Sequence, residues 1–229
     1  MTWLWRTCSS AACVLALQAG TVTGRVELRD SREAAVRKKR DFSGVVVWLR
    51  PAAGQVNIPP QRAAMVQRNK TFQPHVLAVT VGSSVEFPNY DPIFHNAFSN
   101  YDGQVFDVGL YPPGTSRTVL FRRPGVVRVF CNIHSAMSAI IVVLQTPYFA
   151  VTGTSGAFEI NGVPPGPYNL GVFHERALPA ALTSLERRVE VPPGALATGP
   201  IVISEAGYLP MPHRNKYGRD YPAEPAYGK

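Results

Sequence analysis

The chain has 229 residues, of which 45% are hydrophobic and 17% charged, with 21 prolines and 19 glycines. These apolar residues suffice for one large or two small β-rich domains, and no stretch reaches the roughly 20 apolar residues of a membrane span. The formal net charge is +8, but the basic residues are scattered apart from a local cluster at 37–40, so we expect no nucleic-acid binding.

The first 19 residues differ from the rest of the chain. Arg6 is their only charge, a short apolar run follows it, and the segment ends on the small residue Ala19. This pattern is typical of a secretory signal peptide, and we predict cleavage after Ala19 and export, to the periplasm or otherwise. Cleavage would remove Cys8 and Cys13 and leave Cys131 as a lone thiol. Because oxidising compartments disfavour a free thiol, a metal bond would explain its presence.

Short strands account for most of the remaining chain. Apolar and β-branched residues recur, often in alternation, in segments separated by Pro-Gly turns, which predicts an all-β fold of the β-sandwich type. The predicted strands cover Thr21–Leu28, Gly44–Leu49, Val76–Phe87 (broken by a turn at Gly82-Ser83), Val126–Phe130, Ala139–Leu144, Ala157–Ile160 and Tyr168–Phe173. A helical turn is predicted only within Ala177–Leu185. The tail, 205–229, is rich in Tyr, Pro and charge and is predicted to be an extended surface arm or disordered.

The segment Cys131-x2-His134-x2-Met137 and the upstream His95 carry the chemistry that we expect of the chain. Together they offer one thiolate, two imidazoles and one thioether. Cu(I) prefers soft sulfur and Cu(II) accepts imidazole nitrogen, so a trigonal plane of two His and one Cys with a weak axial Met suits both oxidation states. A tight loop after a strand would present three of these side chains, and His95 would come from another loop at the same end of the sandwich. The sequence therefore predicts one copper ion per chain.

Other uses of these residues fit their spacing less well. A structural zinc site would favour more Cys or His and would gain nothing from Met137. A binuclear copper centre would need a second Cys in the loop. A cysteine nucleophile would be poorly activated by a His three positions away on a loop that ends a strand. The remaining alternative is that Cys131 and Met137 fill the core while His134 lies on the surface.

Further motifs surround the candidate ligands. They are Val81-Gly82-Ser83-Ser84-Val85-Glu86-Phe87-Pro88-Asn89, Asp91-Pro92-Ile93-Phe94-His95-Asn96 and Pro124-Gly125. With these motifs and the short ligand loop, the chain from about Ala64 to Leu144 resembles the cupredoxins, particularly the plastocyanin, pseudoazurin and amicyanin group. The resemblance implies a Greek-key sandwich with a type 1 (blue) copper ion, whose equatorial ligands would be His95, His134 and the Cys131 thiolate and whose axial ligand would be Met137.

The same resemblance implies roles for the neighbours of the ligands. Asn96 would hydrogen-bond across to the Cys loop and hold it in place, as a support behind the ligands. Electrons would enter and leave through the solvent-facing edge of His134. Ile133, Ala136 and Phe94 would form an apolar docking patch for weak, transient partners, with the alternative that they belong to the core.

A second resemblance lies downstream of the ligand loop. The segment 154–170 contains Gly-Ala-Phe and Val-Pro-Pro-Gly-Pro-Tyr, and it resembles the carboxypeptidase-regulatory-like, transthyretin-like sandwiches, although their usual Asp before the first Gly is missing. We predict that a cupredoxin domain, 56–145, is inserted into such a sandwich formed by 20–55 and 146–204. The alternative is two domains in series. His174 and Glu175 are predicted to be a strand-end polar pair, and His75 and His213 ordinary surface residues.

These observations favour a periplasmic electron carrier. By resemblance to composite cupredoxins associated with methylamine utilisation, its partners would be redox proteins, a dehydrogenase or a cytochrome c. The alternatives are a copper delivery or storage module, and an interaction or carbohydrate-binding protein with a secondary copper site. We expect no enzyme activity, because four protein ligands leave no open position for a substrate. The sequence does not define the oligomeric state.

Overall fold

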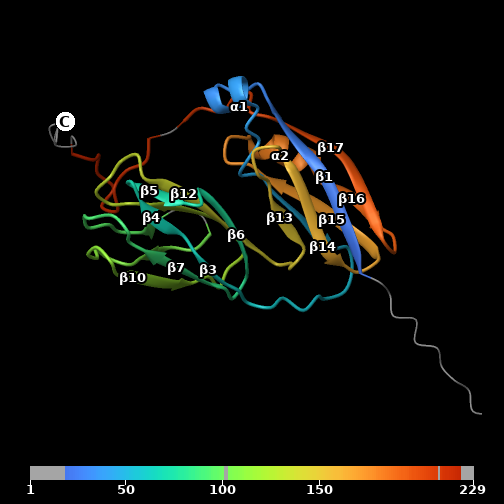
Figure 1. Cartoon of the computed structure of the whole chain (residues 1–229), viewed down its shortest axis with the longest axis horizontal. Coiled ribbons are helices and arrows are strands. Elements are labelled where there is room, and N and C mark those ends of the chain that lie inside the picture. The colour runs from blue at the N-terminus through green and yellow to red at the C-terminus, as the bar shows by residue number, and fades with distance from the viewer. Residues whose placement is uncertain (1–18, 101–102, 211, 223–229) are drawn as a thin grey trace, which may run out of the picture.

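The structure is a computed structural model, and it describes residues 19–100, 103–210 and 212–222. Two β-rich lobes lie side by side (Figure 1). The split lobe contains the strands between residues 20–51 and 149–204, and the central lobe contains those between 62 and 144. Strands make up 46% of the chain and helices 6%, which confirms the predicted all-β fold. The predicted signal peptide lies almost entirely outside the described residues.

The split lobe is built from both ends of the described chain. Its elements are β1 Gly20–Arg29, α1 Ala34–Lys39, β2 Val46–Pro51, β13 Phe149–Val151, β14 Ala157–Val163, β15 Gly166–Phe173, α2 Pro179–Leu185, β16 Arg187–Val191 and β17 Ala195–Ser204. The strands form two sheets with the orders β14-β1-β17 and β13-β2-β15-β16. β1 and β17 pair in parallel, and alternate apolar side chains of both sheets enclose one buried core.

The central lobe carries the predicted copper ligands. Its elements are β3 Arg62–Ala64, β4 Val66–Arg68, β5 Thr71–Gln73, β6 Val76–Thr80, β7 Ser84–Pro88, β8 Phe98–Ser99, β9 Phe106–Asp107, β10 Ser116–Leu120, β11 Gly125–Phe130 and β12 Ser138–Leu144. They form the sheets β10-β7-β3 and β6-β12-β11-β8-β9 and the hairpin β4-β5. A second buried core, which includes Cys131 and Met137, lies between the sheets.

The sequence of β12 shows how the lobes meet. Its run Ala139–Leu144 is apolar at every position and buried throughout, as expected of a strand that is covered on both faces. Ala139, Ile141 and Val143 point into the core of the central lobe. The alternate residues Ile140, Val142 and Leu144 form a third apolar cluster with side chains of β2, β13 and β15 from the split lobe.

The structure agrees with two predictions about local structure and adds one helix. The predicted turn at Gly82-Ser83 divides Val76–Phe87 into the strands β6 and β7, and Gly82 takes a left-handed φ of 87° there. The helix α1 was not predicted from its short sequence, and its Val36 packs into the core of the split lobe. The helical turn predicted at Ala177–Leu185 is the helix α2. Among the described residues, no helix has the length and apolar character needed to cross a membrane.

A pair of ionisable residues joins the two lobes. His75, which precedes β6, is exposed as predicted, and its ring also lies 2.8 Å from Glu175 of the split lobe. Glu205, which follows β17, is buried and accepts hydrogen bonds from Ser31, His174 and Arg176. Burial opposes the ionisation of Glu205, but these donors outweigh it and hold its pKa at about 2.

Candidate metal centre

Two loops of the central lobe hold the predicted ligands. His95 lies between β7 and β8, where its backbone N–H and carbonyl pair with those of Tyr111 at 3.2 and 2.9 Å. Cys131 follows the last residue of β11, and the loop closes where Met137 leads into β12. The N–H of Cys131 donates to the carbonyl of Met137, and the N–H of Met137 donates to the carbonyl of His134, each at 3.1 Å. The β11–β12 pairing therefore fixes both ends of the ligand loop.

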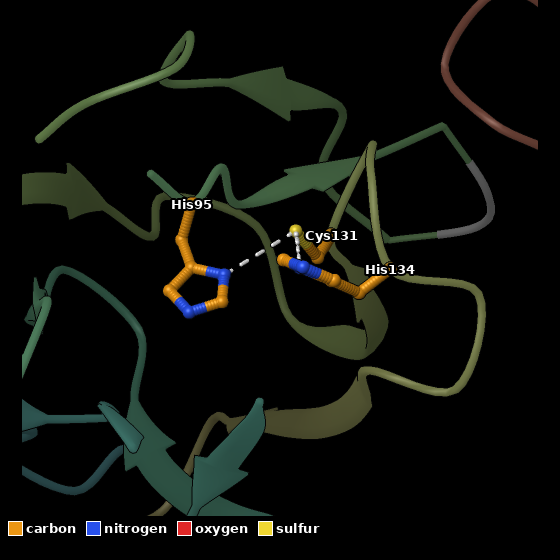
Figure 2. A group of neighbouring side chains, drawn as sticks. All are labelled: His95, Cys131 and His134. Carbon is orange, nitrogen blue, oxygen red and sulfur yellow. Dashed lines mark hydrogen bonds between the residues drawn. The ribbon is translucent and has the colours of Figure 1, made fainter. Parts of the chain in front are cut away.

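The structure brings three of the four predicted donor atoms to one point. Figure 2 shows the rings of His95 and His134 pointing toward the sulfur of Cys131. The distances from Cys131 Sγ are 3.8 Å to His95 Nδ1 and 3.5 Å to His134 Nδ1, and all three donor atoms lie within 4.8 Å of one another. Met137 is fully buried in the same core cluster as Cys131.

These distances fit a shared metal ion. A first-row ion such as zinc lies about 2.0 Å from imidazole nitrogen and about 2.3 Å from thiolate sulfur, and in a trigonal plane these bonds place nitrogen and sulfur about 3.7 Å apart. The observed 3.5 and 3.8 Å lie on either side of that separation. The donor set of one sulfur and two imidazoles, with a thioether close by in the core, matches the preferences of copper.

The environment of Cys131 favours a cation in another way. Burial raises the pKa of its thiol, while the backbone N–H groups of Ile133, Asn96 and His134 point at the sulfur and favour the thiolate. Without a metal, the buried thiol of Cys131 therefore keeps its proton, although three N–H donors point at its sulfur. A cation would replace this proton and use the sulfur as a thiolate ligand, so metal binding releases a proton.

Asp91 orients His95, and the sequence analysis did not identify it. The Asp91 carboxylate accepts from His95 Nε2 at 2.7 Å, from the N–H of Asn69 at 2.6 Å and from the N–H of Lys70 at 2.8 Å. Burial opposes its ionisation, but these three donors hold the pKa of Asp91 below its ordinary value. Because Nε2 donates to the carboxylate, Nδ1 of His95 is left free to face the sulfur. The sequence feature that could have identified Asp91 is its position, four residues before the candidate ligand His95.

The turn that supports Asp91 comes from a different part of the lobe. Asn69 and Lys70 connect β4 to β5 and have φ values of 55° and 54°. Two consecutive left-handed residues are typical of a type I′ hairpin turn, and this conformation directs both N–H groups to the carboxylate. The hairpin β4-β5 thereby fixes the orientation of a ring on a loop more than 20 residues away.

The neighbours of the ligands are placed as follows. The side chain of Asn96 donates to Asp107 at 2.8 Å and to the carbonyl of Gly109 at 3.0 Å. The contact of Asn96 with the Cys loop comes from its backbone N–H, which points at the sulfur of Cys131. His134 is partly exposed, and Phe94, Ile133 and Ala136 are exposed rather than core residues.

Comparison with known proteins gives one curated relative and several solved structures. The methylamine utilization protein MauL of Methylorubrum extorquens is 39% identical over 59 residues, which are 25% of this chain and 52% of the relative. The chain thus spans about half the length of that protein. No protein-family model matches the chain.

The similar solved structures cover the chain in part. A purple cupredoxin from Nitrosopumilus maritimus is 23% identical, covers 36% of this chain and 99% of its own, and has a TM-score of 0.33. A pseudoazurin from Sinorhizobium is 24% identical over 38% of this chain and 76% of its own, with a TM-score of 0.30. A copper-containing nitrite reductase from Thermus scotoductus is 26% identical over 42% of this chain and 25% of its own, with a TM-score of 0.36.

Proposed function

We propose that the protein is a cupredoxin-type electron carrier that binds one type 1 copper ion through His95, Cys131, His134 and Met137. The observation that carries the proposal is the convergence of one sulfur and two imidazole nitrogens within 4.8 Å of one another. Copper bound there would supply a one-electron couple, because sulfur ligands suit Cu(I) and imidazoles suit Cu(II). The partial match to MauL supports this class of function.

The chain's own residues would keep the ligand geometry constant while the charge changes. Asp91 holds the ring of His95 from one side, and the closed loop between Cys131 and Met137 holds the other ligands. The burial of His95, Cys131 and Met137, each with no exposed surface, keeps water away from the centre. A rigid, dry site that suits both oxidation states needs little rearrangement when an electron arrives, and four protein ligands argue against substrate binding at the metal.

The partly exposed His134 is the proposed point of electron exchange. Phe94 is 52% exposed and Ile133 37% exposed, and with Ala136 they would form a small apolar docking patch. Such a patch suits the brief encounters of redox proteins. A dehydrogenase or a cytochrome c of an exported methylamine-utilisation system is the proposed partner, and the chain would reach that compartment by cleavage of its first 19 residues.

We also propose that the two lobes are two domains. The cupredoxin domain would be 56–145, inserted into a carboxypeptidase-regulatory-like sandwich of 20–55 and 146–204. Support comes from the separate buried cores of the two lobes and from the parallel pairing of β1 with β17, which ties the chain segments before and after the insertion. Differential hydrogen exchange of the two cores would test this division.

Copper loading tests the proposed function directly. The protein loaded with Cu(II) should show an intense visible absorption and the narrow copper hyperfine splitting of a thiolate-bound type 1 site in EPR, and rapid electron self-exchange. Cys131→Ser should abolish the absorption, because the thiolate is its source, whereas the control His75→Ala, outside the cluster, should keep it. Intense colour in Cys131→Ser would contradict the ligand assignment. A coloured protein with slow self-exchange that gives its copper readily to an apo-protein would instead indicate copper delivery.

A further inference from the structure

The C-terminal tail folds back onto the ligand loop. After β17 the chain leaves the split lobe and crosses to the far end of the central lobe (Figure 1). The described tail residues 212–222 include a turn in which the N–H of Asn215 donates to the carbonyl of Arg219 at 2.9 Å. The tail was predicted to be an extended surface arm or disordered, and His213 to be an ordinary surface residue. The described part has neither helix nor strand, and it lies on the surface with specific contacts there.

Three tail residues contact the ligand loop itself. The hydroxyl of Tyr221 donates to the carbonyl of Cys131 at 2.8 Å. Nε2 of His213 donates to the carbonyl of Ser135 at 2.8 Å. The N–H of Lys216 donates to the side-chain oxygen of Asn132 at 3.0 Å. The tail thus binds polar groups at the start, in the middle and near the end of the loop.

Two further contacts fix the tail against the lobe. The ring of His213 stacks on Phe130, the residue before Cys131, with 4.0 Å between the ring centroids and 26° between the planes. Nζ of Lys216 lies 2.7 Å from the carboxylate of Asp107, and the same carboxylate accepts the side chain of Asn96, next to His95. The contacts of the tail therefore reach both loops that carry the candidate ligands.

We propose that His213, Lys216 and Tyr221 form a C-terminal clasp that holds the ligand loop in its metal-binding conformation. The clasp satisfies loop carbonyls that the backbone bonds between Cys131 and Met137 leave unpaired. It leaves Phe94, Ile133 and Ala136 exposed, so it restrains the loop without covering the docking patch. The clasp acts on the ligands through their backbone and touches no donor atom. Its role toward copper rests on the proposed function, whereas its effect on the loop does not.

The metal-free protein allows the clasp to be tested without copper. Cys131 has no exposed surface, so a thiol reagent reaches it only when the loop opens, and the reaction rate follows the population of the open form when opening and closing are fast. All variants carry serine at positions 8 and 13, which leaves Cys131 as the single thiol. Tyr221→Phe removes the contacts of the hydroxyl with the carbonyl of Cys131 and with His213 Nδ1 and should raise the reaction rate about fivefold. His213→Ala combined with Tyr221→Phe should raise it by more than about tenfold.

Tyr217→Phe is the matched control. It makes the same chemical change in the same segment, at a side chain that is 70% exposed. Its ring lies over Nζ of the clasp residue Lys216, and phenylalanine keeps that ring, so the substitution should leave the rate unchanged. Thermal unfolding of each variant separates loop opening from global unfolding, since the loss of the clasp should raise the thiol reaction rate by more than the accompanying loss of global stability can explain. Equal rates in Tyr221→Phe, the double variant and the Tyr217→Phe control would overturn the proposal.

Copper loading adds a second readout. In the double variant the copper should pass to a chelator more than about tenfold faster than in the Tyr217→Phe control, and its EPR hyperfine splitting should change. Unchanged copper release and an unchanged spectrum, together with unchanged thiol rates, would overturn the proposal of a clasp. If no variant binds copper while the thiol rates differ as expected, the proposed function fails and the clasp on the loop stands.

Discussion

Replacing Asp91 with asparagine would show how strongly the metal centre depends on the support behind His95. One carboxylate oxygen of Asp91 accepts from the N–H of Asn69, and the other accepts from the N–H of Lys70 and from His95 Nε2. An asparagine has one accepting oxygen, so its NH2 group must face at least one of these donors. The remaining bonds also lose the charge of the acceptor.

The magnitude follows from these lost contacts. A hydrogen bond to a charged group contributes about 1.5–3 kcal/mol, and a buried donor without a partner costs about 1–3 kcal/mol. We therefore expect Asp91→Asn to lower the free energy of unfolding of the metal-free protein by about 2–4 kcal/mol. Because His95 would lose the partner that orients its ring, copper affinity should fall about 10- to 100-fold.

Chemical denaturation and competition with a copper chelator measure the two effects. Asp41→Asn is the control, since Asp41 also accepts a backbone N–H, that of Ser43, but lies in the split lobe away from the centre. This control should leave copper affinity unchanged. Wild-type copper affinity in Asp91→Asn would refute the argument that the carboxylate orients the ligand.

Two further predictions concern the split lobe. Because the pKa of Glu205 is lowered from 4.5 to about 2, its ionised form stabilises the fold by about 3 kcal/mol above pH 4.5, and this contribution is lost as the pH falls toward 2. The free energy of unfolding should therefore depend less on pH between about 2 and 4.5 in Glu205→Gln than in the wild type. Glu190→Gln changes an exposed residue and should leave the pH dependence unchanged. Equal pH dependence in the two variants would contradict the role of Glu205. Gly156→Ala should destabilise the protein by about 3 kcal/mol, because a Cβ there would collide with the carbonyl of Val26 at a φ of 75°. Gly162→Ala, with a φ of 71° in open space, should cost only about 1–2 kcal/mol in thermal unfolding, and equal losses would exclude the collision.

Local sequence patterns were sufficient for several features of the molecule. The alternation of apolar residues in strands such as β7 and the Pro-Gly turns between them predicted the all-β fold, because side chains on a strand alternate between core and solvent. The spacing of Cys131, His134 and Met137 placed three candidate ligands on one loop, since the two strands that flank it must pair closely. The expectation that His95 joins them came from the chemistry of copper, and the resemblance to a known family supported it.

Other features depended on contacts between distant residues. The support of His95 comes from the β4–β5 turn through Asp91, and no spacing rule connects the two segments. The continuous apolar sequence of β12 indicated a strand buried on both faces, but not that the split lobe covers one of them.

The tail shows the limit of sequence reasoning most clearly. Its sequence is rich in Tyr, Pro and charge and lacks the periodicity of a helix or a strand, which predicted an extended surface arm or disorder but no binding partner for it. His213 and Tyr221 lie more than 75 residues from the loop that they bind, and their partners are backbone carbonyls, which every residue possesses. The sequence by itself determined the strands and the chemistry of the candidate ligands, because both depend on near neighbours along the chain. Only the tertiary structure decided what holds those ligands in place, because that depends on which polar groups the folded chain leaves within reach.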